Sequence, residues 1–146
     1  IAGDATRDLD ALLRLRAGVE AFALSDRIAV PGAVSDAQLA ELYANADVFV
    51  LASLFEGYGM VFGEAIAQGL PIVATDVGAA RALIPSDAGI LVPPGDAAAL
   101  REALQSVIAD GVKRAQMAEA AQRAAERLPQ WRQSAHAFAQ VLEACR

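Results

Sequence analysis

The feature that most constrains the fold is the run DVFVLAS (residues 47–53), which is apolar without alternation. A strand with one solvated face alternates apolar and polar residues, whereas a parallel strand covered on both faces does not. Other short β-branched runs end at glycine or proline, and longer stretches rich in alanine and leucine separate them. This alternation predicts an α/β fold with a Rossmann-like parallel sheet flanked by helices.

The expected elements follow from apolar periodicity and from helix start and stop signals. Ser35 and Gln38 form a capping-box pattern, Asp96 is an expected N-cap, and Gly69 is an expected left-handed stop. Strands are expected at residues 1–4, 27–32, 47–53, 72–75 and 89–92. Helices are expected at residues 9–24, 35–45, 59–68, 80–83, 96–109 and 112–127, with a last one starting at Pro129 and carrying Trp131, Phe138 and Leu142.

Composition excludes several classes of protein. A length of 146 residues fits one domain, and a net charge of −6 argues against a nucleic-acid partner or an anionic membrane surface. The single cysteine, Cys145, and the single histidine predict neither a disulfide nor a structural zinc site. Apolar runs are too short to span a bilayer and no signal peptide is visible, so we expect a soluble protein in the reducing cytoplasm. An anionic ligand would have to be held locally.

The stretch LFEGYGMVFGEAIAQGLP (residues 54–71) is the candidate site, because ligands of open α/β sheets bind beyond the carboxyl ends of the strands. Gly57 and Gly59 allow a ligand to approach the backbone closely. The N–H groups of Met60 and Val61, at the start of the next helix, suit a phosphate group. The glycine spacing fits neither the dinucleotide-binding fingerprint nor the P-loop.

Glu56 and Glu64 lie eight positions apart in this stretch. The helical neighbours of Glu64 are mostly apolar, which predicts a desolvated carboxylate that needs donors such as sugar hydroxyls. The alternatives are a solvated helix glutamate for Glu64, and a loop charge or helix-terminus stabiliser for Glu56. Eight helical residues span ~12 Å, too far for the ~5–10 Å carboxyl pair of a glycosidase, so the two would contact different parts of one elongated ligand.

From IAGD to VLEA, the chain resembles the C-terminal, donor-binding domain of the retaining family 4 glycosyltransferases of GT-B fold. The E-x7-E signature of that family is Glu56 to Glu64 in EGYGMVFGEAIAQGLPIVATDVGA. The blocks RIAVPGAVSDAQLAELYANADVFVLAS and AGILVPPGDAAAL, with the late Trp131, match on either side. The chain departs from the family pattern at Ala52, where a proline is usual, and at Arg81, where a glutamate is frequent.

The resemblance implies transfer of a sugar from a nucleotide-diphosphate sugar to an acceptor, with retention at the anomeric carbon and with neither a metal nor a cofactor, since the nucleotide-sugar is a substrate. Glu56 would be the catalytic residue beside the donor sugar, and Glu64 would accept hydrogen bonds from the ribose hydroxyls. The remaining donor-binding residues implied are Gly57, Gly59, Met60, Val61 and, near the base, Val34.

The resemblance also implies a domain organisation: residues 1–128 form the donor-binding domain, and residues 129–146 form a C-terminal helix that braces an N-terminal domain. An upstream segment would supply the central strand, basic residues for the diphosphate, and the domain that binds a glycan, lipid or small-molecule acceptor. The 146 residues alone would then neither fold stably nor transfer sugar.

Two other functions stay open, a nucleotide-sugar 2-epimerase of GT-B fold and a non-catalytic module that binds a nucleotide or a partner. No nucleic-acid partner and no transmembrane segment are expected. The cytoplasm is the expected location, with peripheral attachment of the full-length enzyme to a membrane left open. The sequence leaves the sugar, the base, the acceptor and the linkage undetermined.

Overall fold

A computed structural model describes residues 1–4, 6–128 and 131–144, with the backbone but not the side chain of Trp131. Pro129 as a helix start, the packing of Trp131 and the surroundings of Cys145 lie outside the described residues.

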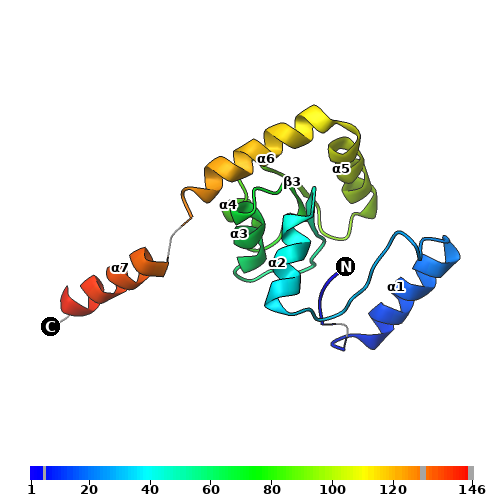
Figure 1. Ribbon diagram of the computed structural model, residues 1–146, viewed down its shortest axis with the longest axis horizontal. Coiled ribbons are helices and arrows are strands. Elements are labelled where there is room, and N and C mark those ends of the chain that lie inside the picture. Colours follow the sequence, from blue (N-terminus) through cyan, green and yellow to red (C-terminus); the bar gives the residue numbers. More distant parts are fainter. Residues whose placement is uncertain (5, 129–130, 145–146) are drawn as a thin grey trace. The chain divides into compact units, whose positions relative to one another are not determined.

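Seven helices and three strands make up the described part of the chain (Figure 1). The helices are α1 (Leu9–Ala21), α2 (Asp36–Ala44), α3 (Met60–Ala67), α4 (Ala80–Leu83), α5 (Ala97–Ala109), α6 (Gly111–Ala125) and α7 (Trp131–Ala144). The strands are β1 (Phe49–Leu51), β2 (Ile72–Thr75) and β3 (Gly89–Val92).

The strands form a parallel sheet in the order β1-β2-β3. Val73 of the middle strand lies opposite Val50 on one side and Ile90 on the other. Every residue of β2 is buried, as expected for a parallel strand with helices on both faces. The predicted α/β class with a helix-flanked parallel sheet is therefore confirmed.

The prediction of strands at residues 1–4 and 27–32 is wrong. The two segments meet at a single parallel bridge between Ala2 and Gly32, where the Gly3 N–H donates to the Gly32 carbonyl at 2.9 Å. Two short segments paired only with each other gain too few ladder hydrogen bonds and too little burial to form a stable sheet.

The chain forms two compact units, Ile1–Leu42 and Tyr43–Arg146. The boundary falls within α2, so its last turn belongs to the second unit. No described residue of the first unit is buried, whereas the second unit contains the hydrophobic core. The sheet and the candidate turn both lie in the second unit.

The core of the second unit has two layers, one on each face of the sheet. Ile72 and Ala74 of β2 pack with Phe62 and Ile66 of α3, while Val73 packs on the other face with residues of α5. In Figure 1, α3 and α4 lie on one side of the strands and α5 lies on the other. Burial of a side chain such as Phe62, which is 1% exposed, stabilises the fold by roughly 1.5–3 kcal/mol.

Local signals set the helix ends as predicted. The Ser35 N–H donates to Gln38 Oε1 at 3.0 Å, and Asp96 accepts from the Ala99 N–H at 2.9 Å. Left-handed glycines flank α3, with φ of +76° at Gly59 and +70° at Gly69. The capping box, the Asp96 N-cap and the Gly69 stop are therefore confirmed, and the turn at Gly59 directs the chain from the carboxyl edge of the sheet into α3.

Candidate functional site

Glu56 lies in the turn that connects β1 to α3. Its carboxylate is half-buried, and Oε1 accepts a hydrogen bond from the Gly59 N–H at 3.1 Å. A carboxylate at this position also interacts favourably with the positive end of the α3 dipole. The structure thus gives Glu56 the helix-terminus contact that the sequence left open, and its second oxygen has capacity for further donors.

The neighbouring loop after β2 fixes the position of this turn. Gly78 lies so close that a Cβ there would be 1.7 Å from the carbonyl oxygen of Glu56, and its φ is +54°. Three residues before Gly78, at the end of β2, the hydroxyl of the buried Thr75 donates to the Ser53 carbonyl at 2.6 Å. Sequence analysis missed these contacts, although a glycine just after the strand IVAT was a usable signal.

The turn then enters α3 through Gly59. Its φ of +76° and the 2.8 Å that would separate a Cβ from Phe62 leave room only for glycine. The N–H groups of Met60 and Val61 follow in the first turn of α3, where a helix supplies no acceptor for them. Gly57 is exposed beside this turn. These backbone groups form a site where an anion would meet the positive end of a helix.

Glu64 lies on α3 and is exposed, so the expectation of a desolvated carboxylate is wrong. Its Oε2 accepts a hydrogen bond from the hydroxyl of Tyr43 at 2.9 Å. The apolar helical neighbours on which that expectation rested do not enclose the carboxylate, because Met60 is 69% exposed and Ala67 is exposed too. Helical neighbours in sequence therefore gave the wrong environment.

Tyr43 lies in the last turn of α2, and its contact with Glu64 joins residues 21 positions apart. The ring stacks on Phe49, with centroids 6.0 Å apart. Burial of the ring raises the pKa of Tyr43 well above its usual range, and the hydrogen bond to Glu64 raises the pKa further.

The predicted site residues fall into two groups. Val34 is a half-buried loop residue of the first unit, and its part in the site stays a prediction. The second unit contains the rest: Glu56, Gly57, Gly59, Met60, Val61 and Glu64.

Asp76 follows β2 and forms an ion pair with Arg81, whose Nε lies 3.2 Å from Asp76 Oδ1. Arg81 is one of the two residues, with Ala52, that depart from the family pattern. Because the arginine side chain is exposed, water screens the pair and it adds little to stability. The pair spans the loop between β2 and α4, which contains Gly78.

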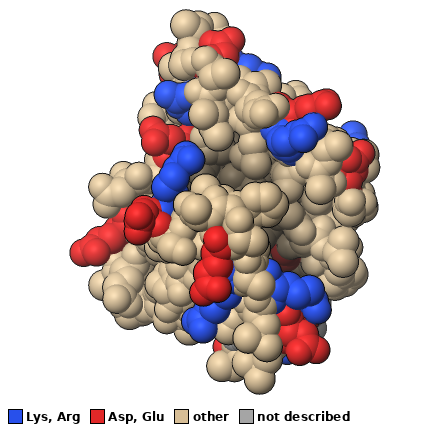
Figure 2. Space-filling view, turned by 90° about the vertical axis from the view of Figure 1, so that its right-hand side faces the viewer, with Lys and Arg blue, Asp and Glu red and all other residues tan. Residues whose placement is uncertain are grey.

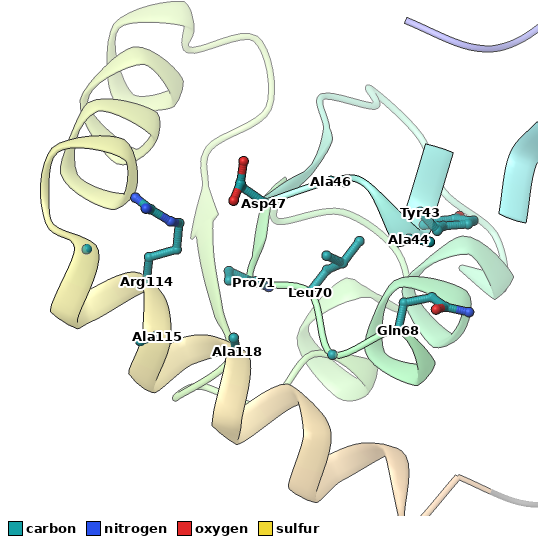
Figure 3. A pocket seen from close by; sticks show the side chains of 12 residues that line it. Tyr43, Ala44, Ala46, Asp47, Gln68, Leu70, Pro71, Arg114, Ala115 and Ala118 are labelled. Atoms are coloured by element: carbon teal, nitrogen blue, oxygen red, sulfur yellow. The ribbon is translucent and has the colours of Figure 1, made fainter. Parts of the chain in front are cut away.

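Two pockets at the edges of the sheet are lined by residues other than the predicted donor residues. One pocket of about 160 Å³ lies at the carboxyl ends of the strands and is lined by residues such as Ala52, Thr75 and Asp96. A wider pocket of about 500 Å³ lies at the opposite edge, before β1 and β2 (Figure 3). Since parallel α/β sheets bind ligands at the carboxyl edge, position and not volume decides which region is the candidate site.

Charge is distributed without a broad basic patch on the face drawn in Figure 2, where Lys and Arg side chains are interspersed with Asp and Glu. Among the described residues, no three His, Cys, Asp or Glu side chains gather as a metal site would require. None of the described helices combines the length and the apolar character needed to cross a membrane.

Residues 1–124 match the sequence profile of a family described as "Glycosyl transferases group 1". The chain belongs to this family. A curated relative, the D-inositol 3-phosphate glycosyltransferase of Xylanimonas cellulosilytica, is 38% identical over 138 residues, which are 94% of this chain and 31% of the relative. The chain thus spans about a third of the length of that glycosyltransferase.

Solved structures of similar proteins share the fold. The Anabaena protein HepE, solved in complex with UDP and with UDP-glucose, superposes with a TM-score of 0.86 at 27% identity, over 98% of this chain and 40% of HepE. Sucrose-phosphate synthase from Thermosynechococcus elongatus superposes with a TM-score of 0.81 at 31% identity, over 98% of this chain and 37% of that protein. This group 1 family member therefore has the fold of one part of those longer chains.

Proposed function

We propose that this chain is the donor-binding part of a retaining family 4 glycosyltransferase, which transfers a sugar from a nucleotide-diphosphate sugar to an acceptor. The observation that carries the proposal is the pair Glu56 and Glu64: Glu56 lies in the turn that leads from the carboxyl end of β1 into α3, and Glu64 lies in the second turn of that helix. Membership of the glycosyl transferases group 1 family and the similarity to HepE, solved with UDP-glucose, support it.

In this proposal the diphosphate lies at the free N–H groups of Met60 and Val61, where the α3 dipole favours negative charge. The Glu56 carboxylate accepts a hydrogen bond from the Gly59 N–H and thereby stabilises the glycine turn. Its remaining lone pairs can accept hydrogen bonds from sugar hydroxyls. Glu64 accepts hydrogen bonds from the ribose hydroxyls, and Val34 lies near the base.

Catalysis would be mainly electrostatic, because donors aimed at the leaving diphosphate stabilise the charge that develops on it while the acceptor attacks from the same face. We include in the proposal that no metal or cofactor takes part. The acceptor, a glycan, lipid or small molecule, would bind an N-terminal domain, with residues 1–128 as the donor domain and residues 129–146 as a helix that braces the other domain. The proposed location is the cytoplasm, with or without peripheral attachment to a membrane.

The test is the affinity of the full-length protein for UDP and GDP, measured by titration calorimetry. Glu64→Ala removes charge-assisted hydrogen bonds worth ~1.5–3 kcal/mol, so affinity for the preferred nucleotide should fall roughly ten- to hundredfold. Glu119→Ala, which removes an exposed glutamate of α6, is the matched control and should leave affinity unchanged. Equal affinities of the Glu64→Ala variant and the unmodified protein would contradict the proposed site.

A further inference from the structure

The hydrogen bond between Tyr43 and Glu64 joins two separate helices. Tyr43 lies in the last turn of α2, and Glu64 lies in the second turn of α3. The tyrosine hydroxyl donates to Glu64 Oε2 at 2.9 Å. In Figure 3, Tyr43 lies at the end of its helix, beside the end of the helix that carries Gln68. The contact therefore belongs to the tertiary structure of the second unit.

Packing holds the tyrosine ring in place. The ring stacks on Phe49 with an interplanar angle of 29°, and Phe49 in turn meets Phe62 edge to face, with centroids 6.4 Å apart. Phe62 is 1% exposed, so this row of three rings is anchored in the core. The position of the hydroxyl consequently follows from the packing of the ring, whereas an exposed glutamate without a partner samples several rotamers.

The chemistry of the pair matches this geometry. A tyrosine hydroxyl is protonated at neutral pH and can donate, and burial, followed by the contact with Glu64, raises the pKa of Tyr43 further in the same direction. An ionised carboxylate accepts hydrogen bonds at both oxygens, so a bond at Oε2 leaves Oε1 and further lone pairs for a ligand. An acceptor that is already oriented loses less conformational freedom when the ligand binds.

We propose that Tyr43 is a positioning residue, which orients the Glu64 carboxylate so that it can accept hydrogen bonds from the ribose hydroxyls of a nucleoside diphosphate. This inference rests on the proposed function, because it assigns a supporting group to the residue that would bind the ribose. Tyr43 itself does not contact the nucleotide, and its contribution is transmitted entirely through Glu64.

The experiment is a double-mutant cycle in the full-length protein, with UDP and GDP as probes. Tyr43→Phe keeps the ring that stacks on Phe49 and removes only the hydroxyl. We expect about three- to tenfold weaker binding of the preferred nucleotide for Tyr43→Phe, an unchanged melting temperature, and no further loss when Tyr43→Phe is added to Glu64→Ala. With the 2′,3′-dideoxy analogue of that nucleotide, Tyr43→Phe and the unmodified protein should bind equally well.

The outcomes separate this inference from the proposed function. If Glu64→Ala weakens binding and Tyr43→Phe does not, the inference is overturned while the proposed function stands. Tyr43→Phe could also weaken binding by the same factor in the unmodified protein and in the Glu64→Ala variant, or by the same factor for the nucleotide and its dideoxy analogue. Either result would show that the tyrosine acts through packing and would overturn the inference. If Glu64→Ala has no effect on binding, the proposed function and the inference fail together.

Discussion

At the scale of single residues, the two glutamates of the E-x7-E pattern have different partners. Glu56 is half-buried and bonds to a backbone N–H of its own turn, whereas Glu64 is exposed and bonds to a side chain of another helix. A contact within three residues is preserved by the turn itself, and a contact across 21 residues depends on the tertiary structure that brings Tyr43 beside Glu64. The two carboxylates should therefore respond differently to substitution.

For Glu56 we predict that the substitution Glu56→Gln in the full-length enzyme lowers turnover more than nucleotide affinity. The amide oxygen of glutamine still accepts from the Gly59 N–H, so the turn is kept, while the negative charge beside the donor sugar is lost. An interaction that strengthens in the transition state affects kcat, and a loss of ~1.4 kcal/mol there would lower kcat about tenfold. Steady-state kinetics with the donor sugar would test this.

An unchanged kcat with a higher KM would show instead that Glu56 contributes equally to the ground state and the transition state. In that case the residue would be a donor-binding group and not a catalytic one.

At the scale of elements, the candidate turn is held by the loop that follows the neighbouring strand. Gly78 contacts the Glu56 backbone, Thr75 bonds to the Ser53 carbonyl, and the ion pair between Asp76 and Arg81 spans the same loop. Because β1 and β2 are paired in register, the loops that follow them emerge side by side at one edge. The position of the turn is therefore a property of two strands together.

We predict that Gly78→Ala destabilises the protein more than Gly95→Ala. Both glycines have positive φ, +54° and +78°, so both substitutions should cost ~1–2 kcal/mol in backbone strain. Only at Gly78 does the new Cβ also meet the Glu56 carbonyl, whereas nothing lies within 4 Å at Gly95, which makes Gly95→Ala the matched control. Urea unfolding of both variants, with nucleotide affinity as a second measurement, would test the contact.

The prediction would be contradicted if both variants lost the same free energy of unfolding and kept their nucleotide affinity. The loop that contains Gly78 could then move away from Glu56 without any effect on the turn between β1 and α3.

At the scale of the whole molecule, the hydrophobic core belongs to the second unit. The described residues of the first unit include no buried side chain, and this holds for every residue of α1. By contrast, β2 is buried along its whole length. Since burial of apolar surface is the dominant stabilising term, the two units should differ widely in local stability.

We predict that, in the 146-residue chain, amides of α1 exchange with solvent much faster than those of β2. No residue of α1 is buried in a core, so its hydrogen bonds can open locally, whereas the hydrogen bonds of β2 open only when the sheet is disrupted. Hydrogen exchange followed by mass spectrometry, resolved to peptides of each segment, would measure the difference. Similar protection of residues 9–21 and 72–75 would contradict the prediction.

The sequence by itself determined the features that depend on near neighbours. Apolar runs without alternation indicated the parallel strands, and the cap residues Ser35, Asp96 and Gly69 indicated helix ends, because these signals act within a few residues. The same stretch of sequence indicated the glycine turn and the two glutamates beside it. Of the candidate site, the linear motif was therefore predictable.

Only the tertiary structure decided which distant groups meet. The bond from Tyr43 to Glu64 and the approach of Gly78 to Glu56 join residues 21 and 22 positions apart, and each arises where segments distant in the sequence meet. The exposure of Glu64 depends on which side of α3 meets the sheet. Residues 1–4 and 27–32 have the pattern of strands but form only one bridge, because a strand needs paired neighbours as well as a suitable sequence.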